Sequence, residues 1–137
     1  MPWVIDTCLL IDIADADPHY SAMSSRLIAT RHSQGLVISP VSYIELAPAF
    51  GGTIAVQNHF LAKLGVDWTE RWTWRDTENA FVAWSGHVKS RRSRELSRRP
   101  IADILIGAFA LRFRGLLTRN VRDFQRIFPN LRIESPK

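Results

Sequence analysis

Short apolar runs alternate with helical patterns along the whole chain, and this alternation constrains the fold more than any other feature of the sequence. The strands that we predict lie at residues 3–5, 36–38, 66–68, 116–118 and 131–133. The helices that we predict cover residues 19–32, 54–64, 77–94 and 100–113, with a shorter one that starts at Pro40 and is broken at Pro48. Neighbouring parallel strands require a crossover connection, which is usually a helix. The pattern therefore predicts an α/β fold with a central, mostly parallel sheet that is covered on both faces.

Length and composition favour one ordinary soluble domain over residues 1–137. The chain has 46% hydrophobic residues, and no repeat or linker-like stretch divides it. Its one cysteine, Cys8, excludes an internal disulfide and suits a reducing compartment. The longest apolar run, Ile104–Leu111, is far shorter than the roughly 20 residues of a membrane span, and residues 1–6 lack the basic leader of a signal peptide. We therefore expect a cytoplasmic protein that does not contact a membrane.

Three carboxylates stand in apolar surroundings, where charged side chains are unusual. Asp6 follows the first predicted strand, Glu45 lies within the apolar helix that starts at Pro40, and Asp103 lies in the first turn of the helix at 100–113. Burying an unpaired carboxylate is costly, so each of these acids needs a partner. Either arginines form ion pairs with them, or a bound cation is coordinated by them.

The positions of these acids favour the bound cation. Asp6 and Asp103 are both expected at the carboxyl edge of the parallel sheet, where the sites of such sheets form. A polar cluster, residues 118–123, follows the strand at 116–118 and falls at the same edge. Oxygen ligands without cysteine or histidine suit hard cations such as Mg²⁺ or Mn²⁺. Such an ion lowers the pKa of a bound water and neutralises charge on a phosphate.

Four motifs together resemble PIN domains, and most closely the VapC-type toxins of bacteria and archaea. The motifs are Val-Ile-Asp-Thr at 4–7, Ser-Tyr-Ile-Glu-Leu at 42–46, Ile-Ala-Asp-Ile-Leu-Ile-Gly-Ala at 101–108 and Leu-Thr-Arg-Asn-Val-Arg-Asp-Phe at 117–124. Each motif alone is weak, but their order, their spacing and the total length match, so the resemblance covers essentially the whole chain.

The resemblance implies a PIN-like (Rossmann-like) three-layer sandwich and a Mg²⁺- or Mn²⁺-dependent endoribonuclease. It further implies a homodimer and a cognate antitoxin that inhibits the enzyme. Carried over residue by residue, Asp6, Glu45 and Asp103 match the best-defined acids of the family and become the expected metal ligands and catalytic residues. Thr118 matches a hydroxyl residue near the metal, and Thr7 accompanies Asp6 in the first motif.

The fourth acid departs from the family pattern. Many PIN domains have aspartate where this chain has Asn120, and Asp123 follows three residues later. Asparagine offers a carbonyl oxygen but no charge. Asp123 is therefore a candidate fourth catalytic acid and Asn120 a candidate supporting residue, and the number of bound metals stays open.

Basic residues suggest where a polyanion binds. The chain has 18 lysines and arginines against 13 acids, a formal net charge of +5. A basic run at 89–99 leads directly to the helix of Asp103, and arginine forks match phosphate geometry. Arg98, Arg99 and Arg119 are the candidate RNA contacts, although a solvated helix end is an equally simple interpretation of the run. The surplus charge also fits an acidic protein partner.

Two other functions remain open: a non-catalytic binding module on the same fold, with its acids paired to arginines, and a DNA nuclease that uses the same acids.

Asp12 lies in an apolar stretch on an expected helix, and we assign it to the surface. Cys8 is interpreted as a small core residue. The absence of nucleophile-elbow, P-loop and dinucleotide-binding motifs disfavours serine hydrolases, P-loop NTPases and dinucleotide enzymes.

Overall fold

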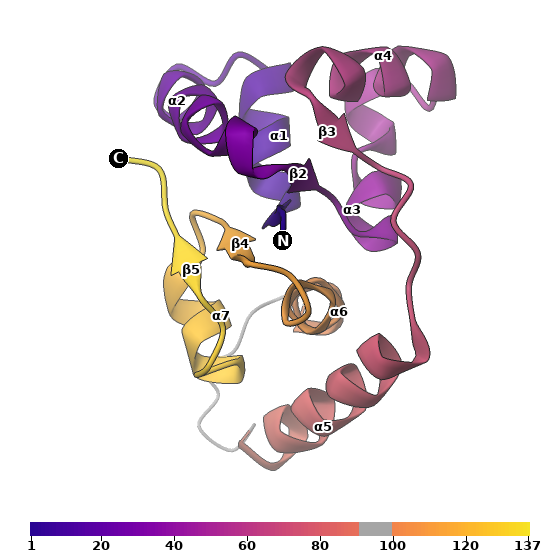
Figure 1. The fold of residues 1–137 in the computed structure, drawn as a ribbon, viewed down its shortest axis with the longest axis vertical. Coiled ribbons are helices and arrows are strands. Elements are labelled where there is room, and N and C mark those ends of the chain that lie inside the picture. Colours follow the sequence, from indigo (N-terminus) through magenta and orange to yellow (C-terminus); the bar gives the residue numbers. More distant parts are fainter. Residues whose placement is uncertain (91–99) are drawn as a thin grey trace.

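Five parallel strands form the centre of the molecule in the order β3-β2-β1-β4-β5 (Figure 1). The computed structural model describes residues 1–90 and 100–137. The strands are β1 (Trp3–Ile5), β2 (Leu36–Val37), β3 (Val66–Asp67), β4 (Gly115–Leu117) and β5 (Ile133–Glu134). Every pairing between neighbours is parallel, and the central strand β1 pairs with β2 and with β4. This sheet confirms the predicted α/β fold with a parallel sheet.

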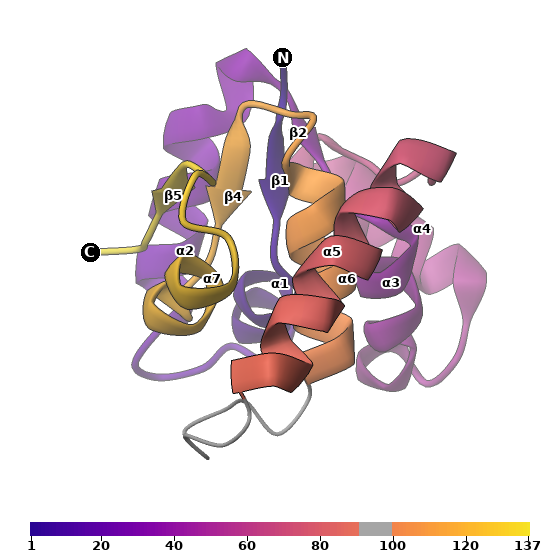
Figure 2. The ribbon, with the colours of Figure 1, turned by 90° about the horizontal axis from the view of Figure 1, so that it is seen from below.

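Helices cover both faces of the sheet and give three layers (Figures 1 and 2). The helices are α1 (Thr7–Ala14), α2 (Ser21–Arg31), α3 (Pro40–Glu45), α4 (Ile54–Leu64), α5 (Trp74–Ser90), α6 (Pro100–Ala110) and α7 (Val121–Ile127). Two short 3₁₀ turns, His32–Gln34 and Ala47–Phe50, connect them. No helix in residues 1–90 and 100–137 is long and apolar enough to cross a membrane.

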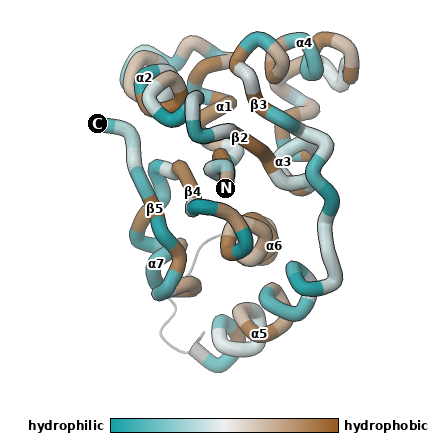
Figure 3. The backbone as a smooth tube through the Cα atoms, in the orientation of Figure 1, coloured by the Kyte–Doolittle hydropathy of each residue, from teal (hydrophilic) through white to brown (hydrophobic). Residues whose placement is uncertain are grey.

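Alternation along β1 divides the core in two. Trp3 and Ile5 point to one face, where they pack with residues of α1, α2 and α4. Val4 points to the other face, where it packs with residues of α6 and α7. All three side chains are fully buried, as expected for a strand covered on both faces. Figure 3 shows apolar colours along β2 and α6.

Local signals fix several helix ends where the sequence predicts them. Ser39 caps α3 by accepting a hydrogen bond from the Ser42 N–H, with Pro40 in the first helical position. Gly65 ends α4 in the left-handed conformation at a φ of 73°, which glycine adopts without steric cost. Asp6 caps α1 by accepting a hydrogen bond from the N–H of Thr7. The cap places the Asp6 carboxylate at the carboxyl end of β1.

Several predicted boundaries differ from the structure, among them the start of α5 at Trp74 instead of Thr77, and the helix α7 was not predicted. The predicted helix at 19–32 begins only at Ser21, because Asp17 closes a preceding turn through the N–H groups of His19 and Tyr20. The predicted helix at 100–113 already ends at Ala110, and β5 lies later than the predicted strand at 131–133. The short helix α7 was hidden because residues 118–123 are dominated by polar side chains. Residues 91–94 of the predicted helix at 77–94 lie outside the described residues.

Candidate active site

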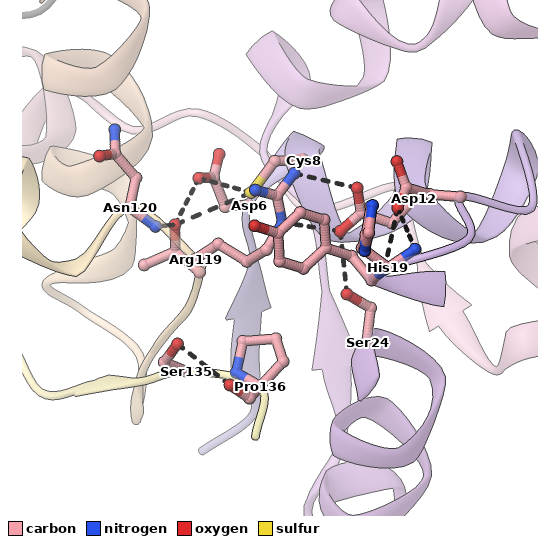
Figure 4. Close-up of polar contacts among 12 residues, drawn as sticks. Asp6, Cys8, Asp12, His19, Ser24, Arg119, Asn120, Ser135 and Pro136 are labelled. Atoms are coloured by element: carbon pink, nitrogen blue, oxygen red, sulfur yellow. Dashed lines mark hydrogen bonds and ion pairs between the residues drawn. The ribbon is translucent and has the colours of Figure 1, made fainter. Parts of the chain in front are cut away.

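A cleft of about 390 Å³ opens beyond the carboxyl ends of β1 and β4. Asp6 follows β1, Glu45 ends α3, and Asp103 lies in the first turn of α6. All three line this cleft, so the structure brings the three sequence-predicted acids together. The remaining lining residues are Thr7, Cys8, Ile11, Asp12, Arg119 and Asn120. Figure 4 shows how Asp6, Cys8, Asp12, Arg119 and Asn120 lie relative to one another.

Asp6 is a buried carboxylate held by neutral donors. Its Oδ2 accepts a hydrogen bond of 2.6 Å from the Thr118 hydroxyl and one of 3.4 Å from the Cys8 thiol, while Oδ1 accepts one of 2.8 Å from the Thr7 N–H. Only 6% of the residue is exposed. Burial raises the pKa of the Asp6 carboxyl above its usual value, the hydrogen bonds oppose that rise, and the charge of Glu45 adds to it. A nearby cation would stabilise the charged form.

Glu45 is oriented by Thr7 across the cleft. The Thr7 hydroxyl donates a hydrogen bond of 2.6 Å to Glu45 Oε1 and lies 2.9 Å from the hydroxyl oxygen of Ser42. Thr7 and Ser42 are both buried. Because Thr7 also donates its N–H to Asp6, it connects two of the three acids. Its predicted supporting position in the site fits this contact.

Thr118 contacts Asp6 and Asn120 lines the cleft, whereas Asp123 is not among the lining residues. Thr118 is fully buried, and its hydroxyl oxygen accepts a hydrogen bond of 2.9 Å from the Asn120 N–H while it donates to Asp6. Asn120 lines the cleft as the residue that precedes α7. Asp123 lies in the first turn of α7, half-buried, and is not among the lining residues of the cleft. The geometry thus favours Asn120 over Asp123 as the residue that completes the site.

The donor chemistry fits a hard divalent cation. Four carboxylates and one amide side chain line the cleft. Asp12 is paired with Arg119, whereas the buried Asp6 has no ion pair within the described residues. As the side chains stand, no three aspartate, glutamate, histidine or cysteine residues in the described part of the chain form a group that could hold one ion. An ion shared by Asp6, Glu45 and Asp103 would therefore require these side chains to turn toward it.

Asp12 corrects the sequence interpretation, which placed it at the surface. The residue is only 4% exposed, and it lines the cleft. Both of its carboxylate oxygens accept hydrogen bonds from Arg119, at 2.8 Å from Nε and 3.0 Å from Nη2, and Oδ2 also accepts one of 3.0 Å from Ser24. The signal that could have revealed Asp12 is its place in an apolar helix, which Glu45 and Asp103 share.

The other sequence-based assignments fare differently. Cys8 packs against the core but is only half-buried and lines the cleft, so its interpretation as a core residue holds in part. Burial, followed by the charge of Asp6, raises the pKa of its thiol to about 12. Arg98 and Arg99, two of the three candidate RNA contacts, lie outside the described residues. Arg119 does line the cleft.

Comparison with known proteins supplies a likeness of fold. No family model matches the chain, and no curated protein does. Among solved structures, a chain of the crystal structure described as VapBC2 from Rickettsia felis bound to a DNA fragment from their promoter matches with a TM-score of 0.66 and 16% identity. The match covers 100% of both chains. At that identity the likeness concerns the fold, and it shows that this chain has the three-layer, PIN-like α/β fold that its sequence motifs predict.

Proposed function

We propose that this protein is a Mg²⁺- or Mn²⁺-dependent endoribonuclease and the toxin of a type II toxin–antitoxin pair. One observation carries the proposal: Asp6, Glu45 and Asp103, which are far apart in the sequence, line one cleft at the carboxyl edge of a parallel sheet. Three acids in one cleft repel one another, so the arrangement is expensive unless a cation joins them. The fold likeness to a chain of a VapBC2 complex supports the proposal.

The residues of the cleft would divide the work. Asp6, Glu45 and Asp103 would hold the ion, which supplies an activated water and neutralises charge on the phosphate when bound. Thr118 and the Thr7 N–H fix the orientation of the Asp6 carboxylate, and the Thr7 hydroxyl fixes that of Glu45. In the hydrolysis, water adds to phosphorus and one P–O ester bond of the RNA breaks. The buried hydroxyls hold the carboxylates in place before the RNA binds.

Partner proteins form the second part of the proposal. The solved relative in fold is described as a complex bound to promoter DNA, and we propose a cognate antitoxin and a homodimer for this chain. The grooves between the early helices are one candidate surface for an antitoxin, since Ile54 there is 66% exposed, although Ile28 is buried in the core. Large apolar side chains are also exposed on α5, where Trp74, Phe81 and Val82 are 75%, 75% and 70% exposed. Exposed apolar surface of this kind is characteristic of protein contacts.

Metal binding and cleavage test the enzymatic part directly. The purified protein is titrated with Mn²⁺ by calorimetry and incubated with single-stranded RNA and, separately, with DNA of the same sequence, with Mg²⁺ or with EDTA. We expect Mn²⁺ binding that is lost in Asp6→Asn and in Asp103→Asn, and cleavage of RNA that requires the metal. Unchanged Mn²⁺ binding in both variants would refute the shared site. Metal-dependent cleavage of DNA but not of RNA would favour the DNA nuclease, and a protein that binds no metal would favour the non-catalytic module.

Growth of bacteria that express the chain tests the toxin role. We expect arrest when the chain is expressed alone, rescue when the product of the neighbouring reading frame is co-expressed, and no arrest with Asp6→Asn. Sedimentation of the purified chain tests the homodimer in the same material. Normal growth with abundant, soluble, metal-bound protein would contradict the toxin role while leaving a nuclease in place.

A further inference from the structure

Arg119 is the one cation among the described residues that line the cleft. It follows Thr118 beyond β4, and its guanidinium reaches α1, where it forms two hydrogen bonds with the Asp12 carboxylate. The Tyr20 ring lies against the guanidinium, with the Arg119 Cζ 4.0 Å from the ring centroid. Figure 4 shows Arg119 and Asp12 beside Asp6 and Cys8. A long, flexible side chain is thus fixed in one orientation at the wall of the cleft.

Two buried groups hold the carboxylate that orients Arg119. Asp12 is 4% exposed and Ser24 is fully buried, and the Ser24 hydroxyl donates a hydrogen bond to Asp12 Oδ2. The Asp12 carboxylate therefore cannot move without breaking contacts in the interior. Because the fork of a guanidinium is planar and rigid, fixing its Nε and Nη2 edge also fixes the direction of the remaining N–H groups.

The opposite edge of this guanidinium remains available for a ligand. Asp12 engages Nε and Nη2, and Nη1 has no hydrogen-bond partner within residues 1–90 and 100–137. Arginine carries five N–H donors, so the pairing with Asp12 leaves donors that can bind an anion. In a cleft that Asp6, Glu45 and Asp103 make acidic, a donor of this kind favours the approach of a phosphate.

We propose that Arg119 binds an RNA phosphate with the guanidinium edge that does not contact Asp12, and that Asp12 and Tyr20 are positioning residues for it. This inference rests on the proposed ribonuclease function and names the group that receives the substrate backbone. The two buried carboxylates of the cleft then have different roles. Asp6 is one of the metal-binding acids, and Asp12 orients the guanidinium of Arg119.

Binding of RNA in EDTA tests the contact without requiring catalysis. A fluorescein-labelled, single-stranded oligoribonucleotide is titrated by anisotropy at several salt concentrations. We expect Arg119→Ala to lower the affinity about tenfold, the effect of losing one or two charge-assisted hydrogen bonds. The slope of log affinity against log salt should fall by about 0.7, the value for one lost phosphate contact on a single strand. Arg75→Ala is the matched control, because Arg75 is exposed and does not line the cleft.

Two further variants separate orientation from charge. Arg119→Lys keeps the charge but loses the fork, and we expect its affinity to fall close to that of Arg119→Ala. Asp12→Asn removes a negative charge from the cleft, which by simple electrostatics would strengthen RNA binding. If Asp12 orients Arg119, binding weakens instead. Circular dichroism melts confirm that each variant is folded.

The outcomes distinguish this inference from the proposed function. Parent-like affinity in Arg119→Lys, a loss in Arg119→Ala no larger than in Arg75→Ala, or tighter binding by Asp12→Asn would overturn it. If the parent cleaves RNA in the presence of Mg²⁺ while these variants bind like the parent, the ribonuclease stands and only the inference fails. If the parent neither binds nor cleaves RNA, both fail.

Discussion

Asp6 and Asp12 lie one before and one within the same short helix, α1, line the same cleft, and are almost equally buried at 6% and 4% exposure. Their partners differ. Asp12 receives a guanidinium and a hydroxyl, whereas Asp6 receives a hydroxyl, a thiol and a backbone N–H. Burial accordingly raises the pKa of Asp6. Burial alone therefore does not distinguish the two acids. The difference lies in the partner, and the buried acid without a cation of its own is the one that we propose to bind the metal.

The largest expected effect comes from removing the charge of Asp6. Asp6→Asn should lower RNA cleavage by about a thousandfold or more, because several kcal/mol of metal-derived stabilisation are lost and each ~1.4 kcal/mol is a factor of ten in rate. Without metal the same variant should unfold at an equal or higher temperature than the parent, since a neutral amide is cheaper to bury than a carboxylate. Cleavage assays and melts in EDTA measure both. Full activity in Asp6→Asn would contradict the proposal that Asp6, unlike Asp12, is a metal ligand.

The second prediction concerns the stability that the Asp12 pairing contributes. Arg119→Ala leaves a buried carboxylate without its cation and should lower the free energy of unfolding by about 1–3 kcal/mol, less than the full value for a buried pair because the Arg119 side chain is 32% exposed. Arg31→Ala is the control, because Arg31 and Glu134 form a more accessible pair at 28% and 25% exposure, for which we expect about 1 kcal/mol or less. Urea unfolding checks the ranking. Equal losses of unfolding free energy in Arg119→Ala and Arg31→Ala would show that the burial of Asp12 does not make its ion pair more stabilising than an accessible one.

The third prediction tests whether Asn120 or Asp123 completes the site beside Asp6. Asn120→Ala should reduce cleavage about tenfold, as removal of a hydrogen-bonding group in an active site commonly does, and Asp123→Ala should reduce it less. The reason is that Asn120 lines the cleft and Asp123 does not. Initial cleavage rates of the two variants decide the order. The reverse ranking would return Asp123 to the site as the fourth acid.

The smallest effect is expected at Asp17, a solvent-exposed acid that contrasts with the buried Asp6 and Asp12. Hydrogen bonds from the N–H groups of Tyr20 and His19 lower the pKa of its carboxyl below the usual value. A lowered pKa contributes stability above the pKa of the unfolded chain, and this stability is lost as the pH falls through the folded value. Asp17→Ala should therefore melt slightly below the parent at pH 7, and the gap should close at pH 2.5. A gap that persists at low pH would show that the charge of Asp17 is not its source.

The sequence by itself predicted the layers and most of the residues that line the cleft. Strand β1, the N-cap of α3 and the end of α4 follow from short-range signals that the structure confirms. The three acids could be selected because each interrupts an apolar segment, and two of them sit at ends of elements where a parallel sheet opens. These are properties of neighbouring residues, which periodicity and capping rules describe directly.

Only the tertiary structure decided how the buried charges are shared. Arg119 and Asp12 are 107 residues apart, so no local pattern could show that this acid has a cation while Asp6 has none among the described residues. The same holds for Asn120 and Asp123, since a short turn into α7 decides which of the two reaches the cleft. A charge is stabilised by whatever lies within a few ångströms of it, and in this protein those neighbours come from strands and helices that the sheet brings together.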